Sequence, residues 1–295
     1  MAATDLFWDY GTAYDMFISL AVLHEPDRYG LRGAWAAGVR SRLPNPERDL
    51  MQRIVETMGW PLHWVCQLPA PRDGETVLTE LARLSPEKRL EALLFNCYVS
   101  DEWQQTMLEV AERGSYTRSD TERLLRAYKK RMEGKKKKST KKMRKHIKSS
   151  LELWANAEEF GEGFYAAMET YYDVFFAEEE ARILPALRTA VTDAKALAAK
   201  MELPELLEEL SAGLRFSAEM TDMDELVLVP SFWGAPLMLL MKLSDTRHMM
   251  VFGGRPQDAS LVPGEVVPDA LFQALKSLAD PTRLRILRYL SEEPL

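Results

Sequence analysis

The sequence has two cysteines and four histidines, and this shortage excludes several kinds of metal and redox protein. Cys66 and Cys97 cannot supply a disulfide framework or a four-cysteine zinc site, which is typical of a protein from a reducing compartment. His63 and Cys66 have a spacing that metal ligands use, but they lie among apolar residues, where a buried cysteine is the simpler interpretation. The sequence therefore predicts no metal site and no cofactor.

Apolar residues also never run on for long enough to cross a membrane. The nearest approach, residues 226–243, contains two prolines, a glycine and Lys242. The first fifteen residues hold acidic side chains where a secretory signal has basic ones, and no short apolar stretch with a cleavage site follows. We therefore expect a cytoplasmic protein without a membrane partner.

The motifs of several common enzyme classes are missing as well. The chain has no Gly-x-Ser-x-Gly nucleophile motif, no phosphate-binding glycine loop and no zinc-protease motif. Glu178, Glu179 and Glu180 are consecutive, so on a helix they point in different directions and do not converge as a catalytic pair. We predict that the protein is not an enzyme, and we assign no catalytic residue.

Positive charge is scarce except in one segment. The net charge is −7, yet residues 129–148 hold twelve Lys or Arg and one Glu, so the rest of the chain is strongly acidic. An acidic surface does not suit a protein that wraps nucleic acid, and any DNA contact must be local. We interpret the basic run as a solvated loop; the functional alternative is contact with DNA phosphates through Lys135, Lys136, Lys137 and Lys138.

Apolar residues recur mostly at intervals of three and four, which predicts a mainly α-helical fold. Ser85 followed by Pro86 is typical of a helix start, and the amphipathic pattern predicts one helix from there to Gly114. Residues 119–122, with the sequence Ser-Asp-Thr-Glu, form a capping box that predicts the start of the next helix.

Helix is also expected over most of residues 150–214. Pro185 should kink or break the part between residues 150 and 200, because proline removes a backbone donor and clashes with the preceding turn. A shorter helix follows in "LPELLEELSAGL", with Gly213 in the position of a C-cap.

The pattern changes after residue 224. Three short apolar runs, separated by proline, glycine and Asp-Thr-Arg, predict two or three strands. Three prolines and a glycine in residues 256–268 predict a linker. We therefore expect a mainly α protein with a small β-sheet at about residues 225–254. Its predicted parts are a helical domain that includes the sheet (1–255), the linker (256–268) and a C-terminal segment (269–295).

Aromatic residues are concentrated in the long helical region, where they repeat at intervals of three and four between Phe160 and Phe176. A helix that is apolar nearly all round is normally a core helix. The functional alternative is one wall of a pocket for a small apolar effector, facing the connection between the first two strands. The residues predicted to line that pocket are Phe164, Tyr165, Met168, Tyr171, Tyr172, Phe232 and Trp233.

The last residues carry the most specific signal. From Asp269 the pattern predicts two helices joined by a tight turn, with Asp280 as the cap and Pro281 in the first turn of the second. The sequence "ALKSLADPTRLRILRYLSEEPL", residues 274–295, closely resembles the start of the winged helix-turn-helix of ArsR-type bacterial transcription regulators. The N-terminal "AYDMFISLAVLHEPDRYGLRGAWAAGVRSRL" is similar to the opening of longer bacterial regulators that place a large helical domain before an ArsR-type DNA-binding domain.

This resemblance implies a transcription regulator. In the family, a recognition helix and a β-wing follow the matching segment, and neither is present up to Leu295, so this chain is not expected to bind an operator specifically. The resemblance implies DNA as the partner of a longer chain, a homodimer, and effector sensing by the N-terminal domain. The family's metal-binding regions have no counterpart here. The competing hypothesis is a small-molecule-binding or protein-interaction module that does not bind DNA.

Overall fold

The structure is a computed structural model that describes residues 4–57, 59–131, 140–217 and 223–264. The chain divides into two compact units, Met1–Arg255 and Pro256–Leu295. In the second unit, the described residues 256–264 form turns without a helix or strand. The ArsR-like segment, the end of the predicted linker and the four lysines at 135–138 lie outside the described residues, so the predicted domain limits stay a prediction.

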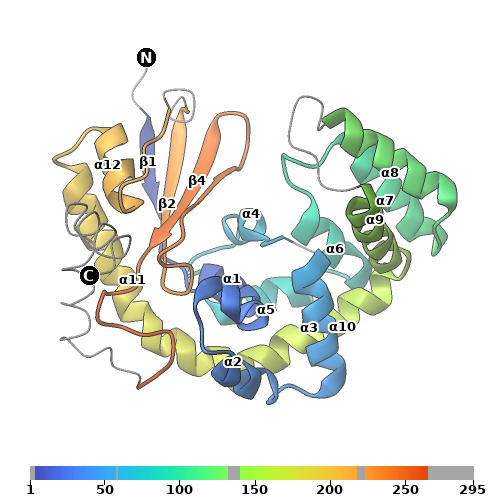
Figure 1. Ribbon diagram of the computed structural model, residues 1–295, viewed down its shortest axis with the longest axis horizontal. Helices are drawn as coiled ribbons and strands as arrows, with labels where there is room; N and C mark the ends of the chain where they lie inside the picture. Colours follow the sequence, from blue (N-terminus) through green and yellow to red (C-terminus); the bar gives the residue numbers. More distant parts are fainter. Residues whose placement is uncertain (1–3, 58, 132–139, 218–222, 265–295) are drawn as a thin grey trace, which may run out of the picture. The chain divides into compact units, whose positions relative to one another are not determined.

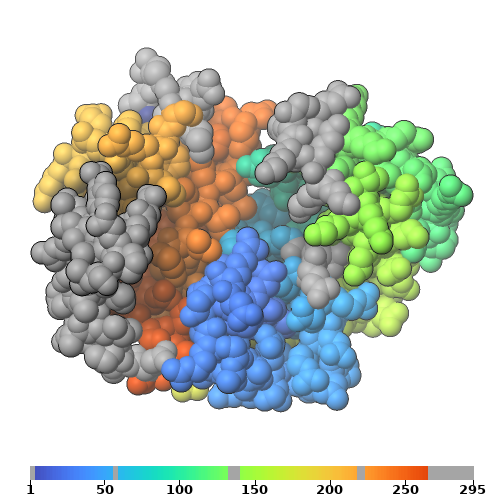
Figure 2. All heavy atoms as spheres, viewed as in Figure 1, coloured from blue at the N-terminus to red at the C-terminus, as the bar shows by residue number. Residues whose placement is uncertain are grey.

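The first unit is mainly helical and holds a small sheet, which confirms the predicted fold class. Within the described ranges, no helix is both long and apolar enough to cross a membrane. Figure 1 shows the strands together with α11 (Ala177–Ala198) and α12 (Leu203–Leu210), while α7 (Asp101–Arg113), α8 (Arg118–Arg131) and α9 (Thr140–Ala155) form a separate helical group. The space-filling view shows the segment that contains α2 and α3, in blue, between these two groups (Figure 2).

The sheet has four strands in the order β1 (Asp5–Trp8), β2 (Glu225–Ser231), β4 (Arg247–Gly253) and β3 (Leu239–Lys242). The first three are parallel, and β3 pairs with β4 in the antiparallel direction. The three apolar runs predicted within residues 225–254 are therefore strands, but the sheet also includes β1, which was not predicted. A four-residue strand is too short for its periodicity to indicate it.

One face of the sheet packs against α11 and α12. Leu226 and Leu228 of β2, with Met250 and Phe252 of β4, form a buried cluster with residues of the two helices. Because β2 and β4 are buried over most of their length, they have continuous apolar sequences rather than alternating ones. The C-cap of α12 is Ser211 rather than the predicted Gly213. Ala212 then takes the left-handed conformation with a φ of 56°, and the N–H of Gly213 donates to the carbonyl of Glu208 at 2.8 Å.

The remaining helices precede or cover this arrangement. They are α1 (Ala13–His24), the 3₁₀ helix η1 (Pro26–Tyr29), α2 (Gly33–Arg40), α3 (Asn45–Thr57), α4 (Leu62–Val65), α5 (Gly74–Arg83), α6 (Pro86–Leu94) and α10 (Ala157–Tyr171). A π-helical turn, η2 (Tyr172–Phe176), joins α10 to α11. In Figure 1 this long run reaches from the α7–α9 group to the sheet. Its first half packs on α3, α5 and α6, and its second half on β2 and α12.

The contact between α6 and α10 is unusually close. A Cβ atom at Gly161 would overlap the carbonyl oxygen of Pro86, so only glycine allows the two helices to approach to this distance. Arg89 spans the same contact: its guanidinium is buried and donates to the carbonyls of Gly161, at 2.7 Å, and Leu81, at 2.9 Å. The hydrogen bonds of Arg89 therefore fix α6 against α5 and α10.

The single helix predicted from Ser85 to Gly114 is wrong, because α6 ends at Leu94 and α7 begins at Asp101. Between them Asn96 forms a turn, accepting the N–H of Tyr98 on its Oδ1 at 2.9 Å. Ser100 then caps α7 by accepting the N–H of Trp103 at 3.4 Å. Asn and Ser offer the backbone such bonds in place of helical ones, and the amphipathic pattern on both sides of the turn concealed it.

Two further details of the predicted helices are also wrong. The capping box of α8 is formed by Thr117 and Asp120 rather than by residues 119–122: Asp120 Oδ2 accepts the N–H of Thr117 at 2.7 Å, and Thr117 Oγ1 accepts that of Asp120 at 3.3 Å. Pro185 does not break its helix, since α11 continues through it. The irregular turn lies instead at η2, about three turns earlier.

Candidate functional site

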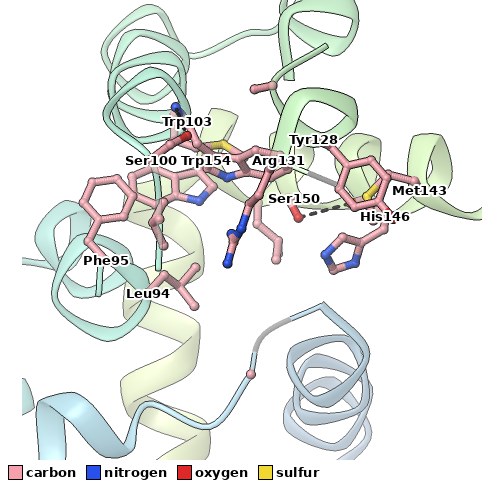
Figure 3. Close-up of a pocket in the computed structure, with 15 residues that line it drawn as sticks. Leu94, Phe95, Ser100, Trp103, Tyr128, Arg131, Met143, His146, Ser150 and Trp154 are labelled. Carbon is pink, nitrogen blue, oxygen red and sulfur yellow. Dashed lines mark hydrogen bonds between the residues drawn. The ribbon is translucent and has the colours of Figure 1, made fainter. Parts of the chain in front are cut away.

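A cavity of about 340 Å³ lies among the C-terminal end of α6 and the helices α7, α8 and α9 (Figure 3). Its volume falls at the lower end of the range of about 300–1,000 Å³ that is usual for small-molecule sites. The described side chains that line it are mostly apolar, with a few hydroxyl, imidazole and guanidinium groups. This combination of apolar walls and a few polar groups is typical of a binding site for a small organic molecule.

One wall of the cavity is aromatic. Trp154, in the last turn of α9, is buried and stacks on Phe95 with ring centroids 4.9 Å apart and planes inclined by 15°. Trp103 of α7 lies on the same side (Figure 3). The break between α6 and α7 positions two of these rings. Phe95 directly follows α6, and Trp103 lies in the first turn of α7, which Ser100 caps.

The opposite wall comes from α8 and α9. Tyr128 of α8 lies beside Met143 and His146 of α9, as Figure 3 shows. Met143, His146 and Ser150 are spaced by three and four residues, so they share one face of α9. Met143 and Met107 of α7 are buried, and their flexible, polarisable thioethers suit a surface that adapts to a ligand.

Arg131, the last residue of α8, provides positive charge at the cavity. Its guanidinium points into the space that the His146 ring also borders (Figure 3). Among the described residues Arg131 makes no ion pair or hydrogen bond, whereas Arg123 of the same helix pairs with Glu109 at 3.0 Å. No Asp or Glu is among the described residues that line the cavity. The cavity is therefore suited to bind a ligand.

A larger hollow of about 640 Å³ is a weaker candidate. It lies on the other side of Trp154, over the helices α6, α7 and α10. Its rim carries Glu87, Glu112, Glu158 and Glu159, all of them exposed. Charged side chains that remain in water do not shape a site for a small apolar molecule.

The residues predicted to line an effector pocket lie elsewhere, on α10, at the start of η2 and in the segment after β2. Phe164, Met168, Tyr171, Phe232 and Trp233 are all buried, with exposed fractions of 3% or less. The helical wall and the segment after β2 do meet. Trp233 packs edge to face on Phe175 of η2, with ring centroids 5.9 Å apart. They meet as a packed aromatic core.

The other predicted pocket residues are less buried. Tyr165 and Tyr172 are half-buried, and each hydroxyl bonds to a glutamate: Tyr165 to Glu169 and Tyr172 to Glu180, both at 3.2 Å. Phe164 lines a void of about 30 Å³. That volume is about the share of one water molecule in the liquid, so it does not hold an organic effector.

A buried carboxylate fixes the segment that contains Phe232 and Trp233. Asp15 of α1 is fully buried and accepts three hydrogen bonds, from Ser231 Oγ at 2.5 Å and from the N–H groups of Phe232 at 3.0 Å and Trp233 at 2.9 Å. Burial raises the pKa of Asp15 to about 6, although these three bonds act in the opposite direction. The carboxylate of Glu179 nearby raises this pKa further.

The second carboxylate of this region is paired. Glu179 of α11 is buried and accepts the indole N–H of Trp233 and the Nε–H of Arg182, each at 2.9 Å. Tyr171 and Ser19 share a hydrogen bond of 2.9 Å between their hydroxyls, and burial raises the pKa of Tyr171 far above its usual value. These groups bond to one another rather than to an open space. They form a structural junction between α1, α11 and the sheet.

No metal site is found in the described ranges, where no group of three or more His, Cys, Asp or Glu side chains is placed to hold an ion. His63 and Cys66 do not form one. Burial lowers the pKa of His63 and raises that of the Cys66 thiol, and Cys97 lies exposed on a different segment.

Sequence reasoning missed the cavity around Trp154. Phe95, Trp103 and Tyr128 each belong to a different helix or helix end, so no aromatic stripe indicates the site. The one local signal was the spacing of Met143, His146 and Ser150, and it lies next to a lysine-rich segment that is typical of a solvated surface.

Comparisons with protein families, with curated proteins and with solved structures find no match for this chain. No relative's activity can therefore be carried over, and a fold by itself does not imply a function.

Proposed function

We propose that this protein is a bacterial transcription regulator of the ArsR type, whose helical domain binds a small effector in the cavity among α6, α7, α8 and α9. The observation that carries the effector part is the 340 Å³ cavity with its aromatic walls. The DNA-binding part is supported by the resemblance of residues 274–295 to the start of the ArsR-type winged helix-turn-helix. The proposal includes a cytoplasmic homodimer, because such regulators bind pairs of half-sites about one helical turn apart.

The position of the cavity suggests how an effector would act. A bound molecule would contact α7, α8 and α9 together, and Trp154 lies two residues before α9 gives way to α10. From there the α10–η2–α11 run continues to the sheet. An effector that prefers one placement of α9 would therefore bias the position of this run. The size of the response is limited to the difference in affinity of the effector for the two arrangements.

DNA binding by a chain extended past Leu295 tests this proposal. The extended chain and the 295-residue chain are titrated against the DNA upstream of their own gene and against a scrambled DNA of equal length, at one fixed salt concentration. We expect the extended chain to prefer the upstream DNA by about a thousandfold or more, and the shorter chain to show no preference. The fixed salt matters because non-specific binding depends steeply on it.

Equal affinity of the extended chain for both DNAs would refute the regulator. A small-molecule-binding module without a DNA role would then be favoured, because the described residues that line the cavity all lie between Gly59 and Trp154, outside the ArsR-like segment. Ala127, which lines the cavity from α8, offers a direct check on the effector part. Ala127→Phe in the extended chain should fill the cavity, keep DNA binding and abolish any response to the effector.

A further inference from the structure

The walls of the cavity around Trp154 favour a ligand with a flat apolar body. Phe95, Trp103, Tyr128 and Trp154 supply four aromatic rings to a space of about 340 Å³. Aromatic rings bind other flat π-systems by offset stacking or by edge-to-face contact, with gains beyond the buried area. The stacked pair of Phe95 and Trp154 already presents such a surface. The small volume limits the ligand to about one or two rings.

The charges at the cavity favour an anion. Arg131 is the one guanidinium among its described lining residues, it has no acidic partner among the described residues, and no Asp or Glu lines the space. A cationic ligand could meet aromatic faces, but it would also meet the guanidinium of Arg131. A carboxylate, by contrast, can accept two parallel hydrogen bonds from a guanidinium, which is among the strongest pairings in proteins.

Two neighbouring arginines are paired within the protein, whereas Arg131 has no acidic partner among the described residues. Arg123 on the same helix pairs with Glu109, and Arg144 on α9 pairs with Glu122. Both of those arginines are neutralised by the protein itself. Arg131 lies where a ligand can take the place of the missing acid (Figure 3).

We propose that the effector is a small aromatic carboxylate, whose rings lie between the aromatic walls and whose carboxylate is bound by Arg131. This inference rests on the proposed function, since it names the chemical class of the molecule that the same cavity takes. His146 and Ser150, on the α9 face that borders the cavity, are the polar groups beside the ring-binding space.

Three probes of one shape test the proposal on the 295-residue chain. 1-Naphthoate, 1-naphthalenemethanol and 1-naphthylmethylamine carry the same rings with a negative, a neutral and a positive group at pH 7. Their dissociation constants are measured by isothermal titration calorimetry. We expect naphthoate to bind about tenfold or more tightly than the alcohol, and the amine to bind most weakly. Equal affinity for naphthoate and the alcohol would overturn the anionic class.

Two matched variants on α8 locate the charge that matters. Arg131→Gln should weaken naphthoate binding by about tenfold and leave the alcohol unchanged. Arg126→Gln, an equally exposed arginine of the same helix that does not line the cavity, should leave both unchanged. If Arg126→Gln weakens naphthoate as much as Arg131→Gln does, the general basic field rather than Arg131 attracts the anion, and the proposed contact is wrong.

A third variant places the probe. Ala127→Phe fills the cavity and should abolish binding of all three probes, with an unchanged far-UV circular dichroism spectrum as evidence that the chain still folds. Naphthoate binding that survives in this variant would place the probe elsewhere and overturn the inference. Failure of every probe to bind the wild-type chain would do the same. The regulator proposal is decided separately by the titration of the extended chain with DNA.

Discussion

The backbone N–H of Trp233 donates to Oδ1 of Asp15 at 2.9 Å, across 218 positions of the sequence. Asp15 lies in α1, shortly after β1, and Trp233 lies just after β2. Because β1 and β2 are parallel neighbours, their C-terminal ends reach the same edge of the sheet. The bond therefore connects the segments that leave two adjacent strands.

Asp15→Ala should lower the free energy of unfolding by about 2–4 kcal/mol. The substitution leaves the hydroxyl of Ser231 and the N–H groups of Phe232 and Trp233 buried without the carboxylate that accepts them. Urea denaturation followed by circular dichroism measures the change. Asp193→Ala, which removes an exposed aspartate from α11, is the control and should change stability by about 0.5 kcal/mol or less. Equal effects of the two substitutions would contradict the role of Asp15.

The contribution of Asp15 should also depend on pH. Its pKa is about 6 in the folded protein against 3.8 ordinarily, so between these values the folded state binds more protons than the unfolded state. Stability from this group is therefore lost as pH rises through that window. The difference in unfolding free energy between wild type and Asp15→Ala should be about 2 kcal/mol larger at pH 4.5 than at pH 7.5. A difference that stays constant with pH would show that the carboxyl group has an ordinary pKa.

Local patterns in the sequence predicted the fold class well, and tertiary contacts account for what they missed. Caps and periodicity indicated α8, α12 and the long run of α10 and α11, and the three apolar runs became β2, β3 and β4. The pairing of β1 with β2 joins Asp5 to Glu225, so no local window contains both strands. In the same way, Asp15 in "AYDMF" gives no sign of burial, because its three donors come from the far end of the unit.

The cavity was missed for a related reason. The aromatic stripe around Phe164 was the strongest local signal, and it belongs to the core, as helices that are apolar all round normally do. The cavity instead combines single residues, such as Phe95 and Trp154, from helices that meet only in three dimensions. Periodicity describes one helix at a time and cannot report such a meeting.

Gly161→Ala should destabilise the protein by about 2–4 kcal/mol, because the new methyl group overlaps the carbonyl oxygen of Pro86 and forces α6 away from α10. The loss includes the buried hydrogen bond from Arg89 to the carbonyl of Gly161. Gly38→Ala in α2 is the control: nothing lies within 4 Å of its added Cβ, so alanine should stabilise that helix by up to about 1 kcal/mol. Thermal denaturation of both variants measures whether each substitution lowers or raises the stability relative to wild type. A stabilising Gly161→Ala would mean that α6 and α10 are not in close contact.

The lysines at 135–138 lie outside the described residues, and their role can be tested only through DNA. If they bind phosphates in the proposed regulator, each releases counterions from the duplex, and the affinity should fall steeply with salt. Replacing Lys135, Lys136, Lys137 and Lys138 with Gln in the extended chain should make the slope of log K against log salt shallower by up to about 3.6, because each phosphate that a lysine neutralises adds about 0.9 to it. Fluorescence anisotropy at four salt concentrations measures the slope. The exposed residues Lys195 and Lys200 of the acidic remainder, replaced in the same way, should leave it unchanged. The loop predicted over residues 129–148 is already wrong in part, because residues 129–131 belong to α8 and residues 140–148 to α9. An unchanged slope in the fourfold variant would show that Lys135, Lys136, Lys137 and Lys138 do not contact DNA phosphates.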